Sequence, residues 1–240
     1  MDNYTKSYDY QSSRSTDLSG AFATLMRSVY GWMCAALAIT ALTAMVVAKN
    51  SEIVMAIASN KLMFWGLMAA ELGLVIYLSS RILKMSFATA SLCFIAYSIL
   101  NGVTMSFIFF VYTMASIAQT FFITAGTFGA MALLGSFIKK DLSTLGRTLM
   151  MLLIGLIIAS VVNIFLHSSG LAIILNYAGV LIFTGLTAYD SQKIKLMLTE
   201  ASEYGVNDQT QKIALLGSLS LYLDFINLFL YLLRIFGDRK

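Results

Sequence analysis

Residues 213–235 read IALLGSLSLYLDFINLFLYLLRI, an apolar run with Asp224 near its middle and Arg234 near its end. A helix needs about 20 apolar residues to cross the roughly 30 Å of hydrocarbon in a bilayer. A strand that crosses a membrane is shorter, at ~9–11 residues, and alternates strictly between apolar and polar side chains. The length and continuity of this run therefore predict a membrane-spanning helix.

Six more apolar runs of similar length precede it, separated by short charged joints. We expect them at 29–48, 62–80, 86–112, 118–138, 148–166 and 171–189. The third run is long enough to be tilted, or broken near Asn101 and Gly102. Of the whole chain, 59% is hydrophobic and 12% charged, against about 25% charged in an ordinary soluble domain. The sequence therefore predicts an all-α integral membrane protein, a bundle of seven transmembrane helices in a lipid bilayer.

The chain divides into three parts by composition. Residues 1–28 are rich in Ser, Thr, Tyr and Asp. We expect them to form a mobile cytoplasmic tail (1–17) and a short amphipathic lead-in. This stretch is too polar and too long for the n-region of a signal peptide. The membrane domain is expected at 29–236, followed by a short C-terminal tail at 237–240.

Lysine and arginine set the expected orientation, because cytoplasmic joints carry an excess of them. Alternate joints hold most of the basic residues, namely Lys6, Arg14, Arg27, Arg81, Lys84, Lys139, Lys140, Arg147, Lys193, Lys195 and Lys212. The opposite joints hold only Lys49 and Lys61, so we expect a cytoplasmic N-terminus. Seven crossings then place the C-terminus outside, although it carries Arg234, Arg239 and Lys240. Either the last run re-enters the same face or, as we expect, it crosses fully.

Several classes of site are excluded or disfavoured. The net charge of +4 comes from basic residues at the ends of apolar runs, so no nucleic-acid surface is expected. Cys34 and Cys93 lie far apart within apolar runs and match neither a disulfide framework nor a metal-binding spacing. The single histidine, His167, excludes a site built from several imidazoles. We expect no cofactor and no enzymatic activity.

Three carboxylates within or beside the runs are the candidate functional residues. An ionised Asp at the centre of a membrane helix costs at least ~2.5–3.5 kcal/mol. Glu71 lies roughly 14 Å into the second run and Asp224 roughly 16 Å into the last, at 1.5 Å per residue. Asp190 closes the sixth run and is interfacial, unless the helix continues through Ser191–Leu198.

Buried carboxylates can be structural or functional. In a structural role they hydrogen-bond to a neighbouring helix, or, for Asp190, cap the following loop. In a functional role, two carboxylates that share a site titrate as a coupled pair, which makes them a proton sensor because they repel only when both are ionised. Carboxylates beside a water-filled path also attract cations, and their oxygens suit Ca²⁺. Asp190, Asp224 and Glu71 are thus candidate transient ligands of Ca²⁺ as a permeant ion.

Two motifs carry a family resemblance: GLTAYDSQKI at 185–194 and SLSLYLDFINLFL at 218–230. In this order they resemble the Bax-inhibitor family, also called the transmembrane Bax-inhibitor-motif or lifeguard group. The similarity is to its bacterial inner-membrane branch. The resemblance implies a seven-helix fold with the last helix central, and a pH-sensitive leak of cations, chiefly Ca²⁺. It also implies that Asp190 and Asp224 sense protons together, with the helix continuing past Asp190.

The resemblance extends to the second helix. Glu71 matches an acidic position that the family has there. In relatives a basic residue near the end of that helix can engage the sensor aspartate. Arg81 is the candidate for this latch in the present chain.

Three other functions are weighed against the leak. The first is a non-transporting regulator that binds membrane proteases or stress-response proteins, for which the N-terminal tail could serve. The second is an intramembrane aspartyl protease, which the sequence disfavours because Asp224 follows Tyr222-Leu223 rather than a Gly-x-Gly turn and the chain has no proline. The third is a secondary transporter, but no pair of Gly/Pro-interrupted helices in matching halves is evident.

Overall fold

The computed structural model describes the backbone of residues 2–240 and the side chains of residues 17–240. This part of the chain is helical. Its elements are α1 (Asp2–Ala48), α2 (Ser51–Ser59), α3 (Lys61–Arg81), the 3₁₀ turn η1 (Ile82–Lys84), α4 (Phe87–Met105), α5 (Ile108–Val111), α6 (Met114–Phe137), α7 (Ser143–Leu166), α8 (Ser169–Ser202) and α9 (Asp208–Phe236).

Within the described residues, seven helical segments are long and apolar enough to cross a membrane. They are α1 from Asp17, α3 with η1, α4 with α5, and each of α6, α7, α8 and α9. This confirms the predicted all-α membrane bundle. The short helix α2 was not expected. The predicted mobility of residues 1–17 stays a prediction, because most of their side chains lie outside the described part of the structure.

Polar side chains fix where several helices begin. The Asn60 side chain accepts hydrogen bonds from the Leu62 and Met63 backbone N–H groups at the start of α3. At the start of α9, Asn207 and Thr210 form a capping box, in which each side chain accepts from the other residue's backbone N–H. Such caps satisfy backbone groups that the first turn of a helix leaves unpaired. These caps place the starts of the helices within the polar joints that the sequence predicts.

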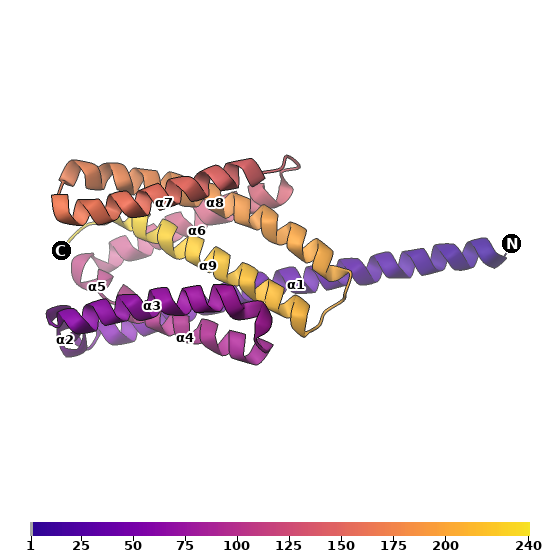
Figure 1. Cartoon of the computed structure of the whole chain (residues 1–240), viewed down its shortest axis with the longest axis horizontal. Coiled ribbons are helices and arrows are strands. Elements are labelled where there is room, and N and C mark those ends of the chain that lie inside the picture. The colour runs from indigo at the N-terminus through magenta and orange to yellow at the C-terminus, as the bar shows by residue number, and fades with distance from the viewer. Residues whose placement is uncertain (1) are drawn as a thin grey trace.

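Helix α9 lies at the centre of the bundle. In Figure 1 it crosses diagonally between a group containing α7 and α8 and a group containing α3 and α4. It packs against α1, α4, α6 and α8, whereas α3 packs mainly on α4 and α7 mainly on α8. In an 18-residue apolar window of each span, the protein buries 67% of the residues in α9, but only 11% in α7 and 6% in α3 with η1. These contacts and this burial confirm the predicted central position of the last helix.

The two chain ends lie at opposite ends of the bundle. Figure 1 shows α1 projecting from the end that holds the α8–α9 joint, while the C-terminus lies at the other end beside α5. Lys240 there donates its backbone N–H to the Val111 carbonyl, and Asp238 accepts from the Thr113 N–H. The last helix therefore crosses the whole bundle, and the alternative of re-entry is wrong.

The break in the third span does not fall at Asn101 and Gly102. Helix α4 continues through both residues to Met105, and the interruption comes at Ser106 and Phe107. Gly102 instead allows α1 to approach closely: a Cβ there would lie 2.7 Å from the Thr40 carbonyl oxygen. Small residues at helix interfaces have this role in membranes. The glycine therefore marks a packing contact, which its sequence neighbourhood alone did not distinguish from a kink.

Candidate functional site

Helix α8 places Asp190 inside the bundle. The helix does not end at the sixth apolar run but continues to Ser202. Beyond Asp190 it keeps one apolar face, on which Ile194, Leu198 and Ala201 are buried. Residues three and four apart lie on the same side of a helix, so this face packs on α9 and prolongs α8. Asp190 is consequently a half-buried helical residue and not the cap of a loop.

Asp190 and Asp224 meet at the interface of α8 and α9. Their side chains are within hydrogen-bonding reach of each other. Asp224 is only 5% exposed, and within the described residues its Oδ2 atom has no hydrogen-bond partner. Two ionised carboxylates have no proton to donate, so a hydrogen bond between them requires that one is protonated. The two groups therefore form a coupled pair that either shares a proton or repels.

Little positive charge compensates this pair. The cation with an evident influence on Asp190 is Lys193, one turn further along the same helix. Its ammonium lies 6.0 Å from the centre of the Tyr189 ring. Neither carboxylate forms a salt bridge with a described residue. Burying two carboxylates without such a partner is costly, which favours a functional role for the pair over a structural one.

Glycines hold the turn of α8 that carries Asp190 tightly against its neighbours. A Cβ at Gly135 of α6 would collide with the Ala188 carbonyl, and one at Gly146 of α7 would collide with the Tyr189 ring. Both contacts lie within two residues of Asp190. Helices that approach this closely leave no room for a side-chain adjustment, so Asp190 has a fixed position relative to α6 and α7.

Gln192 ties the same turn to the joint between α6 and α7. Its Nε2 donates to the Ile138 carbonyl at 3.1 Å and the Lys140 carbonyl at 2.9 Å. Its Oε1 accepts from the Leu142 N–H at 2.8 Å. Nothing in the sequence indicated this role, because a single glutamine two positions after an aspartate matches no known motif.

Lys212 is a second residue whose role the sequence did not reveal. It was counted among the charges that set orientation, yet it is only 6% exposed. Its Nζ lies 3.1 Å from Asp208 Oδ2 and donates to the Met85 carbonyl at 3.0 Å. Asp208 Oδ1 in turn accepts from the Phe87 N–H at 3.3 Å. Together these contacts tie the start of the central helix to the joint between α3 and α4.

Glu71 belongs to a different polar cluster, on the opposite side of α9. It accepts a hydrogen bond from the Thr104 hydroxyl, and Tyr97 and Tyr222 are its electrostatic neighbours. The Thr40 hydroxyl donates to the Ser98 carbonyl and also lies 2.7 Å from the Tyr222 hydroxyl. Since its one hydrogen is used for Ser98, Tyr222 is the donor to Thr40.

The structure therefore joins two of the three predicted carboxylates and separates the third. Within the described residues no group of three metal-ligating side chains comes together, so Asp190, Asp224 and Glu71 do not form one cation site. Transient contacts with a permeant ion stay a prediction. Arg81 is exposed at the end of α3, and no ion pair of Arg81 occurs in the described part of the chain. Its role as a latch likewise stays a prediction.

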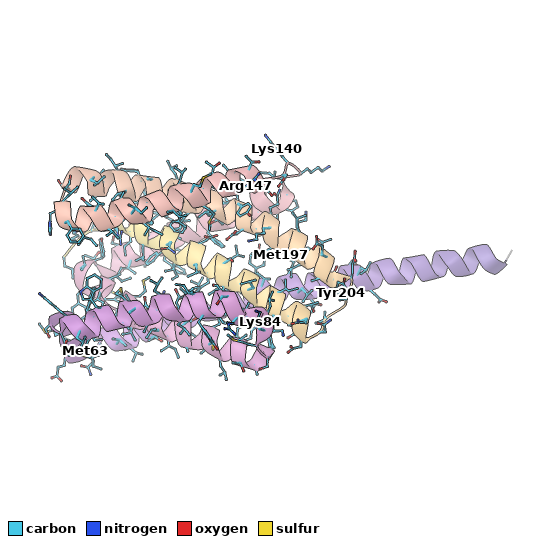
Figure 2. The ribbon with its side chains drawn as sticks, viewed as in Figure 1. Met63, Lys84, Lys140, Arg147, Met197 and Tyr204 are labelled. Carbon is cyan, nitrogen blue, oxygen red and sulfur yellow. The ribbon has the colours of Figure 1, made fainter. Side chains whose placement is uncertain are left out.

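The charged joints gather at one end of the bundle. Figure 2 shows Lys84 and Lys140 toward the end from which α1 projects, and Met63 at the other end. In the joint with Lys140, hydrogen bonds from the Ser143 side chain and backbone lower the pKa of Asp141 below its usual range. This end therefore carries most of the basic residues of the joints, whereas the opposite joints hold Lys49 and Lys61.

The fold and the site define a class: a multi-pass membrane protein with an aspartate pair buried against its central helix. Residues 23–240 match the family model described as "Inhibitor of apoptosis-promoting Bax1". The chain is 48% identical over 217 residues to "Inner membrane protein YbhL" of Escherichia coli (strain K12), covering 90% of this chain and 92% of the relative. It is 45% identical over 218 residues to an uncharacterised protein of Borreliella burgdorferi, with 90% and 92% coverage.

A third relative, an uncharacterised protein of Rickettsia prowazekii, is 40% identical over 245 residues, with 100% of both chains covered. The match of the family model over most of the chain shows the family. The protein belongs to the Bax-inhibitor family, which confirms the resemblance seen in its sequence.

Proposed function

We propose that this protein is a pH-sensitive leak channel for cations, with Ca²⁺ as the permeant ion and the Asp190–Asp224 pair as its proton sensor. The observation that supports this most is the contact between two carboxylates at the α8–α9 interface, where Asp224 Oδ2 has no hydrogen-bond donor among the described residues. A group in such a position changes its interactions when a proton arrives or leaves. No covalent chemistry is required of it.

Gating follows from repulsion across one helix interface. When one aspartate carries a proton, it can donate to the other and hold α8 against α9. When both are ionised, they repel and favour a separation of the two helices. A free-energy difference of about 1.4 kcal/mol changes the ratio of two states tenfold, so a modest repulsion is sufficient.

An aromatic layer on the other side of α9 from the pair supports the assignment of this structure to a closed state. The Tyr222 ring is fully buried and packs edge-on against Phe94 and Tyr97, with centroids 5.7 and 5.9 Å away. Asp224 and Tyr222 are two residues apart, so they face roughly opposite sides of α9. Any path that connects the aspartate pair to Glu71 would need this layer to move.

The orientation is part of the proposal. The basic joints lie at the end from which α1 projects, and such joints favour the cytoplasmic side. We therefore place the N-terminus in the cytoplasm and the C-terminus on the other side of an inner membrane, as the name of the Escherichia coli relative indicates for that protein.

The test is Ca²⁺ flux into liposomes that contain the purified protein, measured between about pH 6 and pH 8. We expect a pH-dependent flux in the wild type that loses its pH response in Asp190→Asn and Asp224→Asn. Asp141→Asn is the matched control, because this carboxylate lies in an exposed joint. Flux no greater than in empty liposomes at every pH would overturn the leak and favour a regulator that binds other membrane proteins.

A further inference from the structure

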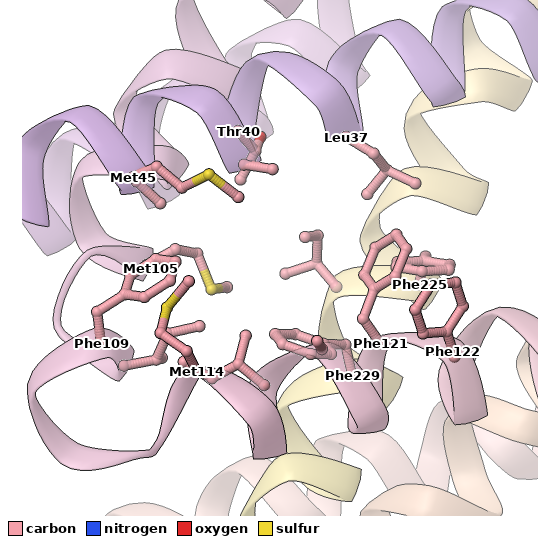
Figure 3. A pocket seen from close by; sticks show the side chains of 16 residues that line it. Leu37, Thr40, Met45, Met105, Phe109, Met114, Phe121, Phe122, Phe225 and Phe229 are labelled. Carbon is pink, nitrogen blue, oxygen red and sulfur yellow. The ribbon is translucent and has the colours of Figure 1, made fainter.

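A crevice opens between α1 and α6 in the half of the bundle near the C-terminus. Its volume is about 340 Å³. Figure 3 shows its lining, with Met45 from α1 and Met114 from α6 on opposite sides and Phe225 and Phe229 of α9 further to the right. The crevice exists because α1 packs chiefly on α4 and α9, and α6 chiefly on α8 and α9, so these two helices leave a gap above the central helix.

The mouth of the crevice faces the bilayer. Met45, Met114 and Phe122 line it and are 44%, 58% and 73% exposed. They lie on two membrane-spanning helices, so what reaches them there is hydrocarbon. The crevice is thus continuous with the lipid-facing surface of the protein.

The chemistry of the lining excludes a polar occupant. Fifteen of its 16 residues are apolar, and the exception is Thr40. The Thr40 hydroxyl is 3% exposed and already bonded to the Ser98 carbonyl and the Tyr222 hydroxyl. Water or an ion in this space would lack hydrogen-bond partners, and apolar cavities of this kind stay dry. The crevice is therefore separate from any path for cations.

Its dimensions match one hydrocarbon chain. Along α1 it extends from Leu37 to Met45, which is about 12 Å of helix. Half of a bilayer's hydrocarbon is about 15 Å thick, so the crevice spans most of one leaflet. A volume of 340 Å³ over this length gives a cross-section of roughly 28 Å². A space this narrow suits a single extended hydrocarbon chain.

A positive charge marks the outer end of the crevice. The exposed Lys240 ammonium donates to the carbonyl of Phe109, a lining residue, at 2.7 Å. This is the level at which the headgroup of a lipid would lie if its chain followed the crevice inward. An ammonium there complements a phosphate, and long basic side chains commonly extend to the membrane interface.

We propose that the α1–α6 crevice is a binding site for one acyl chain of a bilayer phospholipid, whose phosphate lies beside Lys240. The chain fills the space between the two methionines and rests on Phe225 and Phe229. Phe225 directly follows Asp224 on the central helix, so the bound lipid supports the segment that carries the buried aspartate. The site needs no ion flux in order to be occupied, and it stands independently of the leak.

The test counts phospholipids retained by the full-length protein in native mass spectrometry after purification in mild detergent. We expect one phospholipid per wild-type chain. The double variant Ala41→Phe/Ala118→Phe places rings in the crevice, and we expect it to lower the retained fraction about tenfold or more. Ala115→Phe is the matched control: Ala115 is also exposed on α6 but does not line the crevice. It should retain the lipid as the wild type does.

Equal retention by the wild type and the crevice-filling variant would overturn the proposal, as would a wild type that retains no phospholipid. Size-exclusion profiles confirm that each variant is folded. If the phenylalanine pair does not fold, Ala41→Leu/Ala118→Leu fills less of the space. That variant should bind an intermediate amount, and a level equal to that of Ala115→Phe would count against the site.

Discussion

Two polar sites flank the central helix, and they differ in how their carboxylates are satisfied. On the α8 side, Asp224 faces Asp190 and lacks a protein donor for Oδ2 among the described residues. On the α3–α4 side, Glu71 accepts from the Thr104 hydroxyl beside a layer of tyrosines. One site can satisfy its members only by taking up a proton, whereas the other has a neutral donor in place. The difference supports the proposal that the first site senses protons, and it favours a structural role for the second.

The largest effect is expected where the aspartate site depends on close helix packing. In Gly135→Val the new side chain would collide with the Ala188 carbonyl, force α6 away from α8 and lower the free energy of unfolding by about 3 kcal/mol. Thermal unfolding of the purified variant in detergent measures this loss of stability. Gly129→Val is the control, since a Cβ there meets no atom within 4 Å. An equal loss of stability in both variants would show that the close contact between α6 and α8 at Gly135 does not determine stability.

A smaller effect of opposite sign is expected from Asp224→Asn. The introduced amide can donate to the Asp190 carboxylate and removes the repulsion of two negative charges. At about pH 8 this should stabilise the protein by about 2 kcal/mol, and the gain should shrink at about pH 5, where protonation of the wild-type pair already relieves the repulsion. Thermal midpoints at the two pH values test it. A loss of stability at both would mean that the pair is a structural hydrogen-bonding site.

At the Glu71 site, loss of the hydrogen-bond donor should lower the stability of the protein, whereas Asp224→Asn should raise it. Thr104→Val leaves the half-buried carboxylate of Glu71 without this hydroxyl, which should cost about 1 kcal/mol. Thr148→Val is the control, because Thr148 is exposed and its hydroxyl donates to the Thr144 carbonyl of its own helix. The comparison between the two sites fails if Thr104→Val changes the pH dependence of flux as strongly as Asp224→Asn.

The smallest effect concerns the tyrosine layer that separates the sites. Tyr222→Phe removes the hydrogen bond to Thr40 but keeps the buried ring. A hydrogen bond between membrane helices is worth ~0.6 kcal/mol on average, so we expect a shift of that size in chemical denaturation. Tyr204→Phe, at an exposed joint, should be neutral. An effect several times larger would assign Tyr222 a role in keeping the bundle closed.

Much of the helical framework was predictable from local sequence. The last run was expected at 213–235 and the helix spans Asp208–Phe236, because the caps and the apolar length are both local properties. The extension of α8 beyond Asp190 was not predictable from composition. Its polar residues resemble a loop, and only the burial of Ile194 and Leu198 against α9 stabilises the helix there.

The roles of single polar residues were the least predictable. Lys212 looked like an orientation charge, and Gln192 had no distinguishing context, yet both bind backbone groups of distant joints. Gly102 looked like a kink and is a contact with α1. In each case the partner lies far away in the sequence, so no local pattern encodes the interaction.

By itself the sequence determined that this is a seven-helix membrane protein with energetically costly carboxylates in its last and second spans. Hydrophobic length and charge are local properties of the chain, so they do not depend on which helices pack together. It also identified the family through two motifs. The residue pattern left open which carboxylates meet, and only the family resemblance implied that Asp190 and Asp224 act together. The tertiary structure brings these two side chains together, because α8 continues inward along α9. It alone separated Glu71 from them and formed the crevice between α1 and α6, since both depend on which faces of the helices pack together.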